Sequence, residues 1–426
     1  MMSKMTRRDV IKAGALGVGA LVTPAFASRL ARVGSDRIGV GLIGCGGRGT
    51  GAAWNALEAD PSVNIVALAD VFQDRLDGAL GHLNGEASWN GRIDVPAERR
   101  FVGFEAYEKL LALPEVDYVC IATPPHFRPI HFEEAVRRGK HVFMEKPVAV
   151  DATGIRRVIA AAKKADHAGL SVVAGTQRRH ERCYLELMDR VHSGQLGELV
   201  GASCYWNQGG LWVHERQPDE SDMEYQIRNW LYFCWLSGDH ICEQHIHNLD
   251  VINWAMGSTP LRAMGMGGRQ VRTGPEYGNI FDHFSIEYEY PGGVRVQSMC
   301  RQIDGCAGRV DERLAGTRGS AIAWPGRSQI WGENAWEFKG DNPNPYMVEH
   351  KDLIASIRGE CTRLNEGVRV AESALTAIMG RMSAYTGQEV TWEQAMGSKL
   401  DLAPAAYEFG AVEVDPVPTP GRTPLV

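Results

Sequence analysis

The chain has 426 residues and a formal net charge of −7, with 44% hydrophobic and 23% charged residues. That length is enough for two domains with substantial cores, and the composition excludes a disordered chain or a small disulfide-stabilised scaffold. Lys and Arg number 45 against 52 Asp and Glu, so we expect no nucleic-acid partner. The 9 cysteines are scattered without a C-x-x-C pair, which favours unpaired, mostly buried thiols.

The first 27 residues have the pattern of an export signal. Arg7 and Arg8 precede a weakly apolar run, Ala13 to Val22, and Ala25-Phe26-Ala27 has the form of a cleavage site. The run is ten residues long, whereas a membrane span needs about 20. Paired arginines before such a run resemble a twin-arginine signal, which carries folded proteins. We therefore expect a periplasmic or otherwise exported protein with no membrane association after cleavage.

A dinucleotide-binding pattern follows between residues 36 and 150. The expected elements are a buried strand, a helix and a second strand, over residues 37–43, 50–58 and 63–69. The loop after the first strand is a G-x-G-x-x-G, in which Gly44 permits a tight turn, Gly46 admits a pyrophosphate and Gly49 lets helix and strand pack closely. The free N–H groups and the dipole at the helix start favour such an anion.

An acidic residue completes this pattern. Asp70 lies 21 residues after Gly49, at the end of the second predicted strand. A carboxylate at that point can accept hydrogen bonds from the adenosine ribose hydroxyls. It would also repel a 2′-phosphate, so the sequence favours NAD over NADP.

The alternation of strands and helices continues, with a strand over 116–122, a helix over 128–138 and a strand over 141–144. Alternation predicts a parallel, doubly wound sheet with ligands at the carboxyl ends of its strands. Two of these ends carry polar groups, namely Thr123, Pro124 and His126 after one strand and Glu145 and Lys146 after the other.

Residues 151–400 are predicted to form a second domain, and 401–426 an extended tail. A helix is expected over 151–168, strands over 171–175, 199–206, 281–290 and 293–302, and helices between 345 and 386. The predicted fold class is an α/β Rossmann domain followed by an α+β domain with a large, mostly antiparallel sheet.

The glycine loop, Ala122-Thr123-Pro124 and Glu145-Lys146-Pro147 together resemble the Gfo/Idh/MocA family of oxidoreductases. The resemblance implies that the C-terminal helices pack back near the first domain. It also implies that an open sheet face joins subunits into a homodimer or homotetramer. The expected cofactor-binding residues are Gly44, Gly46, Gly47, Arg48, Gly49, Asp70, Thr123, Pro124, His126, Glu145 and Lys146.

A second motif lies at Glu243, His247 and Asp250, which match an acid-x-x-x-His motif of that family with an Asp three residues on. Residues four apart share one helix face, so Glu243 and His247 are expected to point together into a site. Glu243 stands where the family usually has Asp, and His245 where it often has Gly. We predict His247 as general base and acid, Lys146 as proton partner and substrate anchor, and Glu243 as the orienting carboxylate.

Aromatic residues crowd between Tyr205 and Trp235, with polar groups among them. Flat apolar faces beside hydrogen-bonding groups suit a sugar ring, although an aromatic core or interface has the same pattern. The expected substrate-binding residues are Arg178, Trp206, Asn207, Trp230, His245 and Asp250. His240, Cys242, Glu243, His245 and His247 are all metal-ligand types, but His245 and His247 would face different sides of a helix, so we expect no metal.

These features predict an exported NAD-dependent oxidoreductase acting on a secondary hydroxyl of a sugar, polyol or glycoside, with NAD kept tightly bound. One alternative is an NAD-dependent glycoside hydrolase, which would oxidise transiently, eliminate, add water and reduce again. A second is a non-catalytic sugar-binding protein, which the presence of Lys146, Glu243 and His247 disfavours.

Overall fold

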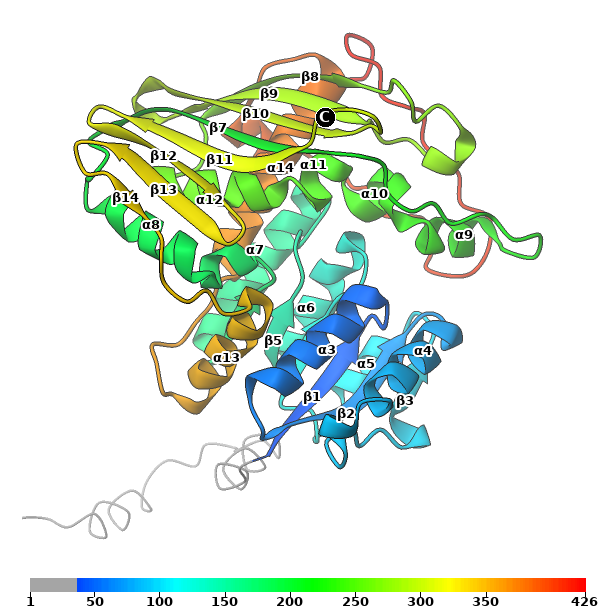
Figure 1. The fold of residues 1–426 in the computed structure, drawn as a ribbon. Helices are drawn as coiled ribbons and strands as arrows, with labels where there is room; N and C mark the ends of the chain where they lie inside the picture. The colour runs from blue at the N-terminus through cyan, green and yellow to red at the C-terminus, as the bar shows by residue number, and fades with distance from the viewer. Residues whose placement is uncertain (1–36) are drawn as a thin grey trace, which may run out of the picture. The chain divides into compact units, whose positions relative to one another are not determined.

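The computed structural model describes residues 37–426, so the predicted signal, residues 1–27, lies outside the described residues. Six strands form the first sheet, in the order β3-β2-β1-β4-β5-β6 (Figure 1). Strands β1 and β2 are apolar and almost wholly buried, as strands covered by helices on both faces must be. The strands are β1 Ile38–Ile43, β2 Val63–Asp70, β3 Arg100–Val102, β4 Tyr118–Ile121, β5 His141–Met144 and β6 Val172–Ala174.

The helices of this domain connect parallel strands, and the pairs β2–β3, β1–β4, β4–β5 and β5–β6 are all parallel. The sixth strand follows α7, so the first sheet extends beyond the expected boundary at residue 150. A parallel neighbour for β5 can only be reached by a crossover, and α7 is that crossover. The helices are α3 Gly47–Ala59, α4 Gln73–Asn84, α5 Ala106–Leu111, α6 Arg128–Arg137 and α7 Ala152–His167.

Nine strands form the second sheet, in the order β14-β13-β12-β11-β7-β10-β9-β8-β15. The β7–β10 pair is parallel, and the other neighbouring pairs are antiparallel. The predicted fold class is therefore confirmed. The strands are β7 Leu199–Gln208, β8 Arg262–Gly268, β9 His283–Tyr290, β10 Val294–Gln302, β11 Arg309–Gly316, β12 Gly319–Trp324, β13 Arg327–Gly332, β14 Trp336–Glu337 and β15 Val390–Thr391.

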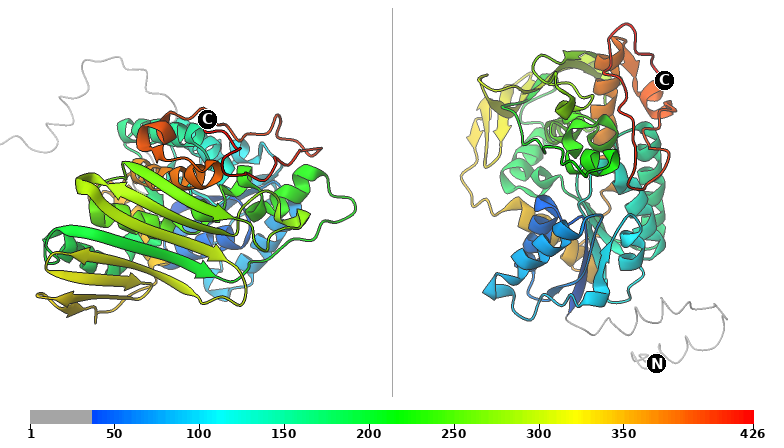
Figure 2. Two further views of the ribbon diagram at one scale, coloured as in Figure 1. Left: turned by 90° about the horizontal axis from the view of Figure 1, so that it is seen from above. Right: turned by 90° about the vertical axis from the view of Figure 1, so that its right-hand side faces the viewer.

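One face of this sheet is covered by α8 Arg182–His192, α12 Ile246–Met256 and α14 Gly367–Thr386. The other face is seen uncovered in Figure 2, and Met264 and Met266 on β8 are 53% and 77% exposed there. Such alternation of buried and exposed residues is typical of an antiparallel sheet with one packed face. The other helices of this half of the chain are α9 Asp222–Arg228, α10 Cys234–Ser237, α11 His240–Glu243, α13 Pro345–Arg358 and α15 Trp392–Gly397.

Helices from late in the chain contact the first domain. Helix α13 packs on α3, and α14 packs on α7. A single hydrophobic cluster contains Ile43 of β1, Met144 of β5 and Leu375 of α14, so both sheets share one continuous core. Within residues 37–426, no helix combines the length and apolar character needed to cross a bilayer.

Candidate functional site

The glycine loop joins β1 to α3, and two of its glycines are required by the backbone. Gly44 has φ +93°, and a Cβ there would lie 2.7 Å from the carbonyl carbon of Ala122. A Cβ on Gly49 would lie 1.8 Å from the carbonyl oxygen of Gly44. By contrast, a Cβ on Gly46 or Gly47 would meet no atom within 4 Å. The loop therefore packs tightly on its inner side and leaves open space where α3 begins.

The open side of the loop suits a phosphate. Helix α3 has Gly46 as its N-cap, and no side chain caps its first N–H groups. These groups and the helix dipole attract an anion. The arrangement fits the pyrophosphate of a dinucleotide, with Gly46 and Gly47 as its backbone contacts.

Asp70 ends β2 beside the same loop. Its carboxylate accepts hydrogen bonds from the backbone N–H of Cys45 at 2.6 Å and of Phe72 at 2.9 Å. Burial raises the pKa of Asp70, although these two hydrogen bonds oppose the shift. The carboxylate is thus fixed in direction by the backbone and still has lone pairs for a ribose hydroxyl.

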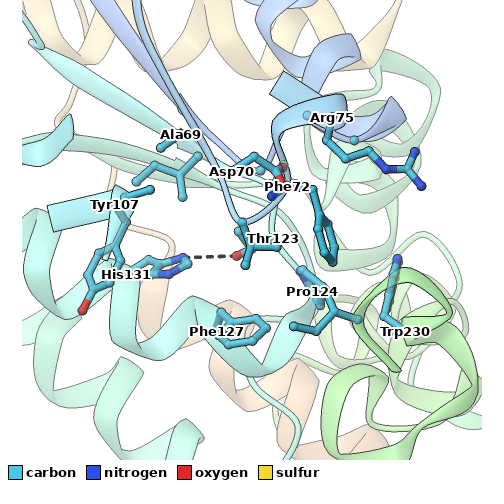
Figure 3. Close-up of a pocket in the computed structure, with 18 of the residues that line it drawn as sticks. Ala69, Asp70, Phe72, Arg75, Tyr107, Thr123, Pro124, Phe127, His131 and Trp230 are labelled. Atoms are coloured by element: carbon cyan, nitrogen blue, oxygen red, sulfur yellow. Dashed lines mark hydrogen bonds between the residues drawn. The ribbon is translucent and has the colours of Figure 1, made fainter. Parts of the chain in front are cut away.

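A cavity of about 540 Å³ lies along the loop and Asp70 (Figure 3). The first domain supplies Phe72, Phe104, Thr123 and Pro124 to its wall, and Thr123 also forms a hydrogen bond with His131 Nδ1 at 3.2 Å. The second domain supplies the opposite wall with Trp212, Ile227, Arg228 and Trp230. Trp230, expected at a sugar, therefore lies on the cofactor cavity.

Three predicted cofactor residues, His126, Glu145 and Lys146, do not line this cavity. His126 is 7% exposed, and its Nε2 forms a hydrogen bond with the Tyr407 hydroxyl at 2.8 Å. Burial lowers the pKa of His126 to about 4, so the ring is neutral. His126 therefore packs among aromatic residues, where Tyr407 of the tail covers it, and does not contribute to the cavity wall.

Arg48 of the glycine loop holds two carboxylates that are distant in sequence. Its Nε donates to Glu145 Oε1 at 2.5 Å, and its Nη2 donates to Glu349 Oε1 of α13 at 3.2 Å. Burial and the charge of Glu145 raise the pKa of Glu349. Burial has the same tendency at Glu145, but Arg48, Lys146 and Arg128 outweigh it and lower its pKa. One guanidinium therefore contacts two carboxyl groups whose pKa values shift in opposite directions.

Lys146 follows β5 and reaches across to the second domain. Its Nζ donates to the backbone carbonyl of Glu243 and, at 3.0 Å, to Glu243 Oε1. The Lys146–Pro147 peptide bond is cis, and Arg128 donates to the Pro147 carbonyl at 2.6 Å. The side chains of Lys146 and Glu243 are only 12% and 14% exposed. The structure thus pairs Glu243 with Lys146.

His247 lies in the first turn of α12 and stacks on Trp206, with ring centroids 5.8 Å apart. Its Nδ1 is buried and has no hydrogen-bond partner within the described chain. Burial, together with the charges of Lys146, Arg178 and Arg48, lowers the pKa of His247 well below its usual range. The imidazole is therefore neutral, and its free lone pair can accept a hydrogen bond from a hydroxyl group.

The prediction that Glu243 and His247 share one helix face is wrong. Glu243 ends the short helix α11, and α12 begins at Ile246 with His245 as its N-cap. Helix α12 is buried almost all round, including its polar residues His247, Asn248, Asp250 and Asn253. Glu243 and His247 are associated instead through Lys146, whose Nζ is bonded to Glu243 and whose charge acts on His247.

The remaining predicted substrate residues make contacts within the protein. His245 Nε2 forms a hydrogen bond with Ser298 Oγ at 2.7 Å. The Asp250 carboxylate accepts from Arg179, Arg369 and Ser373. Both side chains are thus bonded to other polar groups of the protein, as buried polar atoms usually are.

Arg178 and Trp206 lie near His247, whereas Asn207 does not. The Arg178 guanidinium is ion-paired with Glu312 and lies 5.6 Å from the centroid of the Trp206 ring. Trp206 and His247 stack on the packed face of β7. Side chains alternate along a strand, so Asn207 points to the opposite face of the sheet.

The sequence did not predict four polar residues that lie around Arg48 and Arg178, namely Gln177, Tyr346, Glu349 and Glu312. Gln177 Nε2 donates to the Tyr346 hydroxyl at 3.1 Å, and the Arg48 guanidinium lies 4.9 Å from the Tyr346 ring centroid. No motif marks these residues, because their partners are more than 100 residues away. In the described chain no group of three or more His, Cys, Asp or Glu side chains could hold a metal ion.

This fold and site define a nucleotide-binding oxidoreductase. Residues 38–173 match the family described as "Oxidoreductase family, NAD-binding Rossmann fold", and residues 184–322 match the GFO/IDH/MocA C-terminal domain. Together these matches cover more than half of the chain. The chain belongs to the Gfo/Idh/MocA family.

Several characterised relatives are similar in sequence. An inositol 2-dehydrogenase from Ralstonia nicotianae is 26% identical over 262 residues, which are 60% of this chain and 65% of the relative. A 2,7-anhydro-N-acetylneuraminate hydratase from Escherichia coli is 26% identical over 200 residues, 47% of this chain and 50% of the relative. The matches thus span between half and two thirds of the length of these relatives.

Solved structures show the same fold at lower sequence identity. The aldose-aldose oxidoreductase from Caulobacter crescentus, complexed with glycerol, has a TM-score of 0.66 and 19% identity, covering 83% of this chain and 99% of that chain. GenD2 from gentamicin A biosynthesis, in complex with NAD, has a TM-score of 0.64 and 16% identity, covering 84% and 97%.

Proposed function

We propose that this protein is an exported NAD-dependent oxidoreductase that oxidises or reduces a secondary hydroxyl of a sugar, polyol or glycoside and keeps NAD tightly bound. The observation that carries the proposal is the pairing of Lys146 with Glu243 at the carboxyl end of β5, near a neutral His247. The inositol 2-dehydrogenase among its relatives supports the substrate class. Asp70 supports NAD over NADP.

The residues of this group divide the proton chemistry. Bound NAD supplies the hydride acceptor or donor. The neutral His247 imidazole takes the proton of the substrate hydroxyl and returns it in the reverse direction. Lys146 binds the hydroxyl oxygen and stabilises the negative charge that develops there. Glu243 holds Lys146 in place, and Trp206 offers an apolar face to the ring of the substrate.

Export and retention of NAD belong together in this proposal. Free NAD is scarce outside the cytosol, so an exported enzyme needs a resident cofactor. The paired arginines at Arg7 and Arg8 support export of the folded protein. The uncovered face of the second sheet, with Met264 and Met266, supports a homodimer or homotetramer.

The test uses protein that has been exported under the direction of its own N-terminal signal and then purified. Mass spectrometry of the small molecules released on denaturation should identify NAD or NADH. Addition of inositols or aldoses should then raise the absorbance of reduced nicotinamide in the bound cofactor. Exported protein that binds neither NAD nor NADP, even when they are supplied, would overturn the proposal.

A second candidate is an NAD-dependent glycoside hydrolase that oxidises, eliminates, adds water and reduces again. The hydratase among the relatives favours it, since water addition is one of these steps. Release of the aglycone from an aryl glycoside, with no net change in bound NADH, would distinguish it from a net oxidoreductase.

A further inference from the structure

Residues 401–412, which we call the strap, follow α15 and run from the N-terminus of α7 in the first domain to α9 in the second. Figure 1 shows this part of the tail running past α9 without forming a helix or strand. At its start the N–H of Leu402 donates to Asp151 Oδ2 at 2.9 Å, next to the N-terminus of α7. At its end the carbonyl of Val412 accepts from Gln226 Nε2 of α9 at 2.8 Å. The strap is therefore fixed at both ends, once to each domain.

Two aromatic residues of the strap pack on rings that line the cofactor cavity. Phe409 stacks on Phe72, with centroids 5.8 Å apart and planes 15° apart, and contacts Phe104 at 5.3 Å. Tyr407 contacts Phe127 at 5.7 Å. Phe72, Phe104 and Phe127 all line the cavity, whereas Tyr407 and Phe409 do not. The strap therefore supports this wall from behind.

The strap also holds the opposite wall of the cavity. The N–H of Met223 in α9 donates to the carbonyl of Gly410 at 3.0 Å. Helix α9 carries Ile227 and Arg228, which line the cavity. The Arg228 guanidinium lies 3.9 Å from the Phe72 ring centroid and is ion-paired with Asp74 of α4. The two walls thus meet at Phe72, between Arg228 and Phe409.

We propose that the strap retains the cofactor: the nucleotide leaves only after residues 401–412 detach and the walls around Phe72 separate. This inference rests on the proposed function, because it requires a nucleotide in the cavity. It adds a specific structural device for the retention that an exported enzyme needs. The contacts of the strap must break before release, so they raise the barrier to dissociation without touching the ligand.

The experiment measures release of NADH from the full-length protein. Protein loaded with NADH is mixed with excess NAD, and the fluorescence of bound NADH is followed over time. Phe409→Ala removes the ring contacts, and Tyr407→Phe, a milder change, removes only the hydrogen bond to His126. Val414→Ala is the matched control, since Val414 is 47% exposed and follows the strap.

We expect Phe409→Ala to release NADH about tenfold faster than the wild type, a change of about 1.4 kcal/mol in the barrier. Tyr407→Phe should give a smaller increase and Val414→Ala none. Wild-type release rates in both strap variants would overturn the role of the strap while leaving the proposed function intact. A wild-type protein that binds no nucleotide would overturn both. If Phe409→Ala does not fold, the Tyr407→Phe rate decides.

Discussion

Two parts of the site are built in opposite ways: the glycine loop with Asp70, and the Lys146 group. The glycine loop and Asp70 lie within one β-α-β unit, and Asp70 bonds the backbone of Cys45 across 25 residues. Lys146 meets Glu243 across 97 residues, and Arg48 meets Glu349 across 301. The nucleotide loop and Asp70 depend on local backbone geometry, whereas the Lys146 group exists only when the two domains pack. Mutations in the two regions should therefore change different properties of the protein.

The largest effect is expected at Lys146. Lys146→Ala should lower kcat by about 10³-fold, because it removes the group that binds and polarises the substrate hydroxyl. Bound NAD should remain at the wild-type level, since Lys146 does not line the cavity. Steady-state kinetics and nucleotide content measure the two separately. Loss of the nucleotide in this variant would mean that the two regions are not distinct.

Two glycines of one loop should separate folding from binding. Gly49→Ala places a Cβ 1.8 Å from the Gly44 carbonyl oxygen and should lower the free energy of unfolding by about 3 kcal/mol. At Gly46 a Cβ meets no protein atom within 4 Å, so Gly46→Ala should leave stability unchanged while weakening NAD binding about tenfold. Thermal denaturation and NAD titration are the measurements. Equal melting temperatures for the two variants would contradict this assignment.

Variants of Glu243 test how strongly activity depends on the ion pair between Lys146 and Glu243. Glu243→Gln keeps an acceptor for Lys146 Nζ but removes the negative charge, and kcat should fall about tenfold with little change in NAD binding. Glu243→Asp, which restores the charge, should recover most of the activity. A Glu243→Gln enzyme with wild-type kcat would limit Glu243 to a structural role.

A pH-dependent effect on stability is expected at His180, which contacts Asp352 at 2.6 Å and Glu366 at 3.6 Å. Burial opposes its protonation, but these carboxylates raise the pKa of His180 to about 10. A pKa raised on folding gives stability that is complete below the unfolded value of about 6.5 and is lost as pH rises through the folded value.

The stability advantage of the wild type over His180→Asn should therefore shrink as the pH rises from about 6.5 toward 10, by at most about 1.4 kcal/mol per pH unit. Urea denaturation of both proteins across this range measures the difference. A constant difference would show that His180 is held by packing alone. His192→Asn, a change at an exposed histidine, is the control.

The elements around the glycine loop lie where the sequence predicts them because they follow from short-range chemistry. The strand, the glycine turn, the helix and Asp70 succeed one another along the chain, so their geometry is encoded by periodicity and by backbone sterics. The acid-x-x-x-His spacing misled because it assumed one continuous helix. The structure instead ends α11 at Glu243 and begins α12 at Ile246, with Gln244 and His245 between them.

His126, His245 and Asp250 show the same limit. Each is a plausible ligand by residue type, but each satisfies a buried partner: the Tyr407 hydroxyl, the Ser298 hydroxyl and two arginines. Those partners come from segments far away in the chain. Residue type and spacing cannot reveal them.

The sequence by itself determined the nucleotide loop, the parallel order of the first domain and the family resemblance, because local sterics and strand–helix alternation act over few residues. Only the tertiary structure decided which carboxylate pairs with Lys146, which histidine is left neutral beside it, and that residues 401–412 support the cavity. The physical reason is that burial and charge pairing depend on which distant segments meet when the two sheets share one core.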